Sequence, residues 1–188
     1  MRKAILAVSV AAAVALPASV LAQQSQNAQQ PSQIQRQALQ PDKASQSFIK
    51  AAIEGNNAEI EVGKLAQQNG QSDAVKQYGA MLVKDHSEAN TKAQQVARQL
   101  NVEPPTGTSL GQKATYAKLK VLSGTSFDKS FASSMVSDHQ GDIKDYQEQA
   151  KKADPAGSFA KATLPTLQKH LQEAQQLSAQ LNQKQSSR

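Results

Sequence analysis

The chain has 188 residues, a formal net charge of +6, and neither cysteine nor tryptophan. This length suits one domain with tails. The lack of cysteine excludes disulfides and thiol chemistry. The lysines are scattered and form no basic cluster interleaved with aromatic residues, so we expect no nucleic-acid binding. The apolar residues are mainly Ala, Leu and Val, which favours closely packed helices over a sheet sandwich.

The first 22 residues have the order of a secretory signal peptide. Arg2 and Lys3 precede an apolar run over residues 4–14, and small residues around Ala22 suit a cleavage site. We therefore predict a signal peptide over residues 1–22, cleavage after Ala22, and a periplasmic or secreted protein. An uncleaved anchor helix is the alternative, and Pro17 and the cleavage site count against it.

A glutamine-rich segment follows the predicted cleavage site. Nine of the 18 residues from 23 to 40 are Gln, and such a segment has few residues that could form a core. We predict a disordered linker over residues 23–43, which could contact the cell envelope. The helical domain is expected over 44–182, with a second disordered tail over 183–188.

The central part of the chain reads as helix almost throughout. Apolar residues recur every three or four positions, which is typical of amphipathic helices, and helices are expected over residues 45–68, 73–100, 111–122, 126–153 and 155–182. Gly70 ends the first helix, and Pro104 and Pro105 end the second. Pro165 should kink or split the last. The pattern predicts an all-α fold, a four-helix bundle with a short extra helix in the long connection.

A nine-residue phrase ending in Asp-His occurs twice. It reads YGAMLVKDH over residues 78–86 and FASSMVSDH over residues 131–139. The two phrases share an order of aromatic, small, apolar, Val, Asp and His residues. They place His86 and His139 on the apolar stripes of two different helices.

Each long helix carries one polar residue that could bind a metal on its apolar stripe. These residues are Glu59, His86, His139 and His170. A buried ionised carboxylate needs a partner, and the three histidines are candidates for it. The set predicts a site for a transition metal such as Zn, Cu, Fe, Mn or Ni, because its ligands are nitrogen and oxygen atoms. The alternative is a metal-free Glu/His network that fixes the helix register.

Other carboxylates lie close to these residues in sequence. Asp142 follows His139 by three positions and Glu173 follows His170 by three, so each shares a helix face with its histidine and is a candidate further ligand. Asp85 and Asp138 precede their histidines by one position, about 100° round the helix. We expect these two aspartates to bond the backbone or a lysine at a helix boundary.

Three motifs together resemble a known family. EIEVGKLA at residues 59–66, the two Asp-His phrases and LPTLQKHL at residues 164–171 resemble the exported bacterial family called domain of unknown function 4142. The resemblance covers residues 45–181. It implies a ferritin-like four-helix bundle in the periplasm or on the cell surface. Ferritin-like di-iron centres use Glu-x-x-His, whereas this chain has the reversed orders His-x-x-Asp and His-x-x-Glu, so a standard di-iron oxidase centre is not expected and the resemblance does not by itself imply oxygen chemistry.

The leading interpretation is an exported, non-enzymatic bundle that binds a transition metal and acts in envelope stress or metal handling. A metal-dependent, oxidoreductase-like enzyme with its site in the bundle core is the first alternative. The second is a structural or interaction module whose buried Glu/His network holds no metal. The sequence shows no nucleophile set and no phosphate-binding loop, and it leaves open whether the protein is a homo-oligomer.

Overall fold

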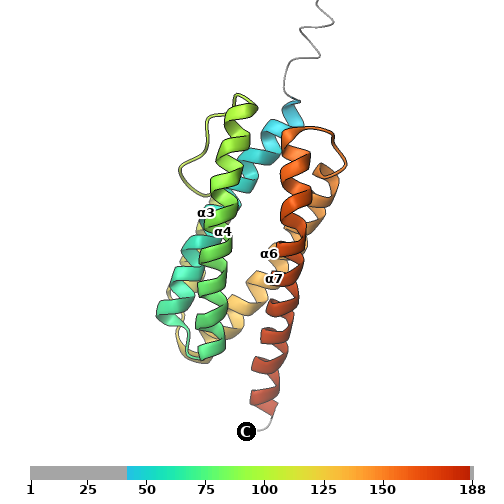
Figure 1. The fold of residues 1–188 in the computed structure, drawn as a ribbon. Coiled ribbons are helices and arrows are strands. Elements are labelled where there is room, and N and C mark those ends of the chain that lie inside the picture. Colours follow the sequence, from blue (N-terminus) through green and yellow to red (C-terminus); the bar gives the residue numbers. More distant parts are fainter. Residues whose placement is uncertain (1–41, 187–188) are drawn as a thin grey trace, which may run out of the picture. The chain divides into compact units, whose positions relative to one another are not determined.

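The computed structural model describes residues 42–186, and the predicted signal peptide and nearly all of the glutamine-rich linker lie outside this range. Every regular element within the described range is an α-helix (Figure 1). The helices are α3 (Lys43–Asn69), α4 (Asp73–Gln99), α5 (Leu110–Lys120), α6 (Gly124–Gln149) and α7 (Pro155–Ser186). None of these helices is both long enough and apolar enough to span a membrane.

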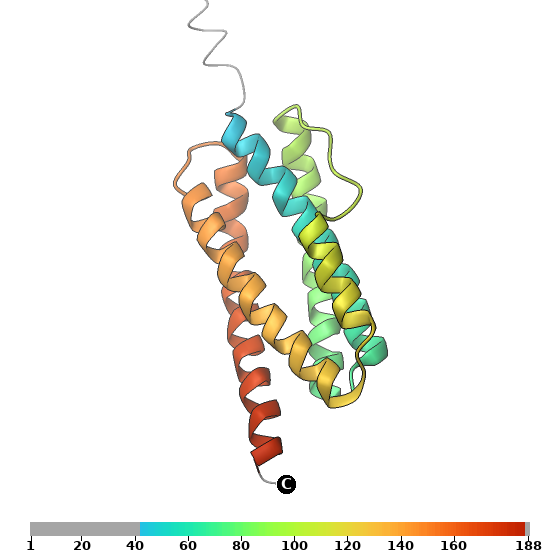
Figure 2. The ribbon, with the colours of Figure 1, turned by 180° about the vertical axis from the view of Figure 1, so that it is seen from behind.

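Two helical hairpins form the bundle. The antiparallel helices α3 and α4 pack on each other, and so do α6 and α7. The connection between the hairpins returns along the bundle and contains α5, so that α4 and α6 run in the same direction (Figures 1 and 2). This is the predicted ferritin-like four-helix bundle, with one long crossover and a short extra helix.

Local capping explains where most helices begin. The side chain of Asp42 accepts a hydrogen bond from the Ala44 N–H at 3.1 Å at the start of α3, and Ser72 caps α4 in the same way. Ser109 and Gln112 form a capping box at the start of α5. Helix α6 begins at Gly124, whose φ of 59° is a conformation that glycine adopts readily.

Helix α7 differs from the sequence prediction in two respects. Pro165 lies inside the helix without dividing it, and the helix continues past residue 182 to Ser186. Pro165 is exposed, so its ring faces solvent, while its neighbours Leu164 and Leu167 pack in the core. This packing compensates for the backbone hydrogen bond that proline cannot make.

The core consists of two apolar clusters. One includes Leu65, Leu82 and Phe131, and the other includes Ile53 and Phe159. On every long helix, the polar residue singled out in the sequence falls between the segments that build these clusters. A polar layer therefore separates two apolar layers in the bundle.

Helices α3 and α4 touch backbone to backbone at a pair of glycines. A Cβ atom added at Gly79 would lie 2.6 Å from the Gly63 carbonyl oxygen and 2.8 Å from the Ala66 Cβ. A Cβ at Gly63 would lie 2.8 Å from the Gly79 carbonyl oxygen. The crossing of α3 and α4 therefore requires glycine at both positions.

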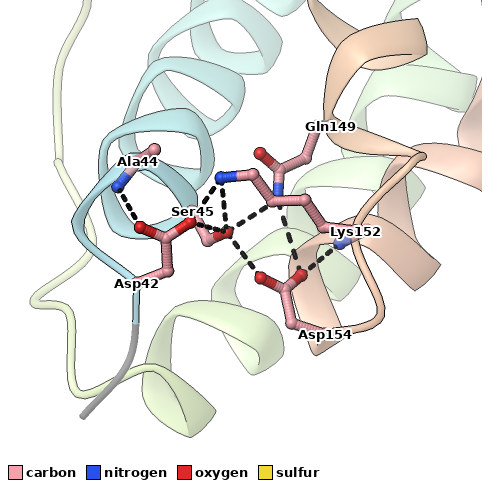
Figure 3. Close-up of polar contacts among 7 residues, drawn as sticks. Asp42, Ala44, Ser45, Gln149, Lys152 and Asp154 are labelled. Atoms are coloured by element: carbon pink, nitrogen blue, oxygen red, sulfur yellow. Dashed lines mark hydrogen bonds and ion pairs between the residues drawn. The ribbon is translucent and has the colours of Figure 1, made fainter. Parts of the chain in front are cut away.

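A polar clasp joins the start of α3 to the turn between α6 and α7 (Figure 3). Ser45 is fully buried; its hydroxyl donates to Asp154 at 2.5 Å and accepts from the Gln149 amide at 2.8 Å. Lys152 pairs with Asp42 beside it. The clasp fixes the end of α3 against the second hairpin, with the hydroxyl satisfied on both sides.

The glycine crossing gives a first prediction. Gly79→Ala should lower the free energy of unfolding by about 1–3 kcal/mol, because the new methyl group forces α3 and α4 apart. Gly141→Ala is the matched control, since a Cβ at Gly141 meets nothing within 4 Å; it should raise stability by about 0.4–1 kcal/mol. Urea unfolding followed by circular dichroism measures both. Equal effects of the two substitutions would contradict the close crossing.

Candidate metal centre in the bundle core

The structure brings the four predicted residues together in the polar layer. Glu59 comes from α3, His86 from α4, His139 from α6 and His170 from α7, and each is at most 5% exposed. One ligand atom from each of the three histidines can be chosen so that the three atoms lie within 4.8 Å of one another. We call these four residues the His₃Glu cluster.

Direct contacts link all four members of the His₃Glu cluster. The Oε2 atom of Glu59 lies 3.0 Å from His86 Nδ1, and its Oε1 atom lies 3.4 Å from His139 Nε2. His139 Nε2 in turn lies 3.3 Å from His170 Nδ1. The carboxylate is therefore surrounded by imidazole rings, as its burial requires.

One ring nitrogen of each histidine lies within hydrogen-bond distance of an oxygen acceptor. His139 Nδ1 donates to the Met135 carbonyl at 2.9 Å, and His170 Nε2 donates to Asp85 Oδ2 at 3.1 Å. His86 Nδ1 lies 2.9 Å from Asn56 Oδ1, close to Glu59 as well, so it also donates. Because a neutral imidazole carries one proton, these bonds assign the lone pair of each ring to the other nitrogen.

These assignments leave an electrostatic mismatch at the centre of the His₃Glu cluster. The lone pairs of His139 Nε2 and His170 Nδ1 face each other across 3.3 Å. His86 Nε2 and Glu59 Oε1 are buried and have no hydrogen-bond partner. Buried acceptors without a donor are costly, so this point in the core needs a hydrogen-bond donor or a cation.

Two residues of the surroundings were missed or misplaced by the sequence prediction. Asp85 was expected to bond the backbone or a lysine; Lys84 is indeed 3.6 Å from its Oδ1, but its Oδ2 accepts from His170. Asn56 was not predicted at all. It precedes Glu59 by three positions, which puts both on one helix face, and that spacing was the available signal.

The two candidate further ligands have different positions. Asp142 is half-buried and lines a cavity together with Glu59 and His86. Glu173 was predicted beside His170, but its carboxylate is 38% exposed and lies 3.7 Å from Lys169 Nζ.

Burial and neighbouring charges shift the pKa values in opposite directions. Burial raises the pKa of Glu59, but the charges of His86 and His139 outweigh it and lower this pKa to about 2. Burial lowers the pKa of His86, but Glu59 reverses the effect and the pKa is raised. Burial lowers the pKa of His170 to about 4, although Asp85 opposes it. The cluster thus keeps its carboxylate ionised.

The aspartates around the cluster are affected in the opposite way. Burial and the charge of Glu59 raise the pKa of Asp142 to about 8 and that of Asp138 to about 6. Near neutral pH much of Asp142 is therefore protonated. The negative charge of this region is concentrated on Glu59.

The raised pKa of Asp142 gives a second prediction. The folded pKa of Asp142, about 8, lies above its ordinary value of 3.8, so folding favours the protonated carboxyl and stability is lost as the pH rises from about 4 to 8. Asp142→Asn removes the titrating carboxyl group and with it this loss of stability at rising pH. The stability of the variant relative to the wild type should therefore increase from pH 5 to pH 8, as measured by urea unfolding with a chelator present. Parallel pH curves for the two proteins would contradict it.

The fold has a counterpart among solved structures. A crystal structure of a DUF305 fragment from Deinococcus radiodurans aligns with a TM-score of 0.67 and 11% identity, covering 74% of this chain and 98% of that chain. At this identity the match shows the fold alone. No curated protein matches the sequence. A model of the family described as Domain of unknown function (DUF4142) matches residues 28–177. The chain therefore belongs to the DUF4142 family.

Proposed function

We propose that this protein binds one divalent transition-metal ion through the His₃Glu cluster and serves in metal handling outside the cytoplasm. One observation carries the proposal. Three buried histidines donate one ring N–H each to an oxygen, and one ligand atom from each of the three can be chosen so that all lie within 4.8 Å of one another, with Glu59 Oε1 3.4 Å from His139 Nε2. A metal ion can accept an electron pair from each of these ligand atoms.

The oxygen partners of the histidines support this reading. Histidines that bind metals nearly always donate their second ring nitrogen to a carboxylate or a carbonyl, which orients the ring and strengthens the ligand. Here Asp85, Asn56 and the Met135 carbonyl occupy these outer positions. The three oxygen partners differ in type, but each one places the proton of its histidine on the nitrogen that it contacts and leaves the lone pair on the other nitrogen.

The spacing of the donor atoms also suits a metal. Two ligand atoms on a tetrahedral zinc ion are about 3.3 Å apart, given metal–ligand distances of about 2.0–2.1 Å. His139 Nε2 lies 3.3 Å from His170 Nδ1 and 3.4 Å from Glu59 Oε1. Three nitrogen ligands and one oxygen favour Zn²⁺ or Cu²⁺ over Ca²⁺ or Mg²⁺, which prefer oxygen.

A proton is the competing occupant. A shared proton between His139 and His170 would relieve their facing lone pairs, and the His₃Glu cluster would then only fix the helix register. The raised pKa of His86 favours a proton on this ring, but a proton on His86 Nε2 would be a buried donor with no acceptor in the described structure. A metal ion uses this atom as well, which is why we favour the metal.

The cavity that reaches Glu59 and His86 bears on the enzymatic alternative. Its volume is about 50 Å³, which holds an ion or one or two waters but no organic substrate. A role in binding, storing or passing on a metal therefore fits better than an oxidoreductase. The signal-peptide features of residues 1–22 support a periplasmic site for this role.

Metal content provides the third prediction. Mature protein made without a histidine tag and incubated with Zn²⁺ should retain one Zn²⁺ per chain after dialysis, measured by plasma mass spectrometry. His139→Gln should abolish retention because it removes a ligand. Asp85→Asn should weaken the affinity by about 10–100-fold, because Asp85 orients His170. At a free Zn²⁺ concentration of 100 times the dissociation constant, the wild type should gain about 2.7 kcal/mol of stability.

Glu173→Gln is the matched control for a substitution of Glu59. Both remove one carboxylate, but only Glu59 lies in the His₃Glu cluster, so Glu59→Gln should lose affinity while Glu173→Gln keeps it. If the wild type retains no metal and melts at the same temperature with and without Zn²⁺, Cu²⁺, Fe²⁺ or Mn²⁺, the metal proposal is wrong. The metal-free register network would then be the better account.

A further inference from the structure

The burial of the His₃Glu cluster raises the question of how an ion reaches it. Three cavities extend towards this layer of the described bundle. The α4–α7 groove, about 720 Å³, stops at Asp85, which contacts His170 on the nitrogen that faces away from the cluster. A cavity beneath α5, about 260 Å³, reaches Glu59 but no histidine. The third, about 50 Å³, lies mainly between α3 and α6 and reaches both Glu59 and His86.

This third space, which we call the α3–α6 cavity, ends on atoms that lack partners. Asn56, Glu59 and His86 line it and are 3%, 5% and 2% exposed. The Asn56 amide nitrogen, Glu59 Oε1 and His86 Nε2 have no hydrogen-bond partner. Buried polar atoms of this kind point to a polar occupant of the cavity.

The outer part of the α3–α6 cavity carries two carboxylates. Asp142 and Asp145 lie three positions apart on α6 and therefore on one helix face. Asp145 is exposed and Asp142 is half-buried, so the two lie at increasing depth on the way to Glu59. The facing side of α3 offers small residues, among them Ala51 and Gly55. A path lined in this way attracts cations and has no room for larger molecules.

We propose that divalent metal ions enter and leave the His₃Glu cluster through the α3–α6 cavity, where Asp145 and then Asp142 pass the ion from solvent to Glu59. The inference rests on the proposed function and adds a route to it. Glu59 is suited to receive the ion, because it lines the cavity and its Oε1 lies 3.4 Å from His139 Nε2.

Rapid mixing of the mature metal-free protein with Co²⁺ tests the route, since bound cobalt absorbs visible light. The association rate of Asp142→Asn/Asp145→Asn should fall about tenfold, because the steering charge of Asp145 and the carboxyl oxygens of Asp142 that would bind the passing ion are gone. Release to excess chelator should slow by a similar factor, since the same path is used in both directions, and the dissociation constant should change little. High salt should reduce the difference between variant and wild type.

A matched control alters the same number of carboxyl groups elsewhere. Asp138→Asn/Glu88→Gln alters carboxylates that line the cavity beneath α5 and the α4–α7 groove, and it should leave both rates nearly unchanged. Slower uptake by this control, or unchanged uptake by Asp142→Asn/Asp145→Asn, overturns the route. Faster release and weaker affinity in Asp142→Asn/Asp145→Asn would mean that Asp142 is a metal ligand, and this result also overturns the route. If the wild type binds no cobalt, the proposed function itself fails and the route fails with it.

Discussion

A single buried carboxylate among three imidazole rings is the constraint on which this bundle depends. Glu59 contacts His86 and His139 directly, and His139 contacts His170. Because an unpaired charge in the core is costly, the four long helices must be in register for the cluster to form. Any slip of one helix would leave a buried polar group without its partner, so the polar layer selects one alignment of the bundle.

The rest of the core holds the helices in that alignment. Apolar clusters lie on both sides of the polar layer, the glycine crossing fixes α3 against α4, and the clasp at Ser45 ties α3 to the second hairpin (Figure 3). Preorganisation of this kind keeps the histidine and carboxylate groups in one arrangement, as the proposed metal site requires. Burial also shields the cluster from water, which strengthens each polar contact within it.

Much of the fold follows from local features of the sequence. The stripes at three-and-four spacing, the caps at Asp42 and Ser72 and the breaks at Gly70 and Pro104 act locally, so they locate the helices to within a few residues. Pro165 is the exception, because its effect depends on how its neighbours pack. The apolar stripe also reveals which polar residues face inward, and for that reason Glu59, His86, His139 and His170 were recognisable as a set.

The sequence by itself determined that four polar residues, one per long helix, point into a common core, because helical periodicity fixes the face on which a residue lies. Only the tertiary structure decided at what depth they meet and which atoms face each other. Periodicity carries no information about contacts between helices, so it could not show that Asp85 accepts from His170 or that Glu59 lies against both His86 and His139. Those contacts depend on helix register and crossing, which packing of the whole bundle sets.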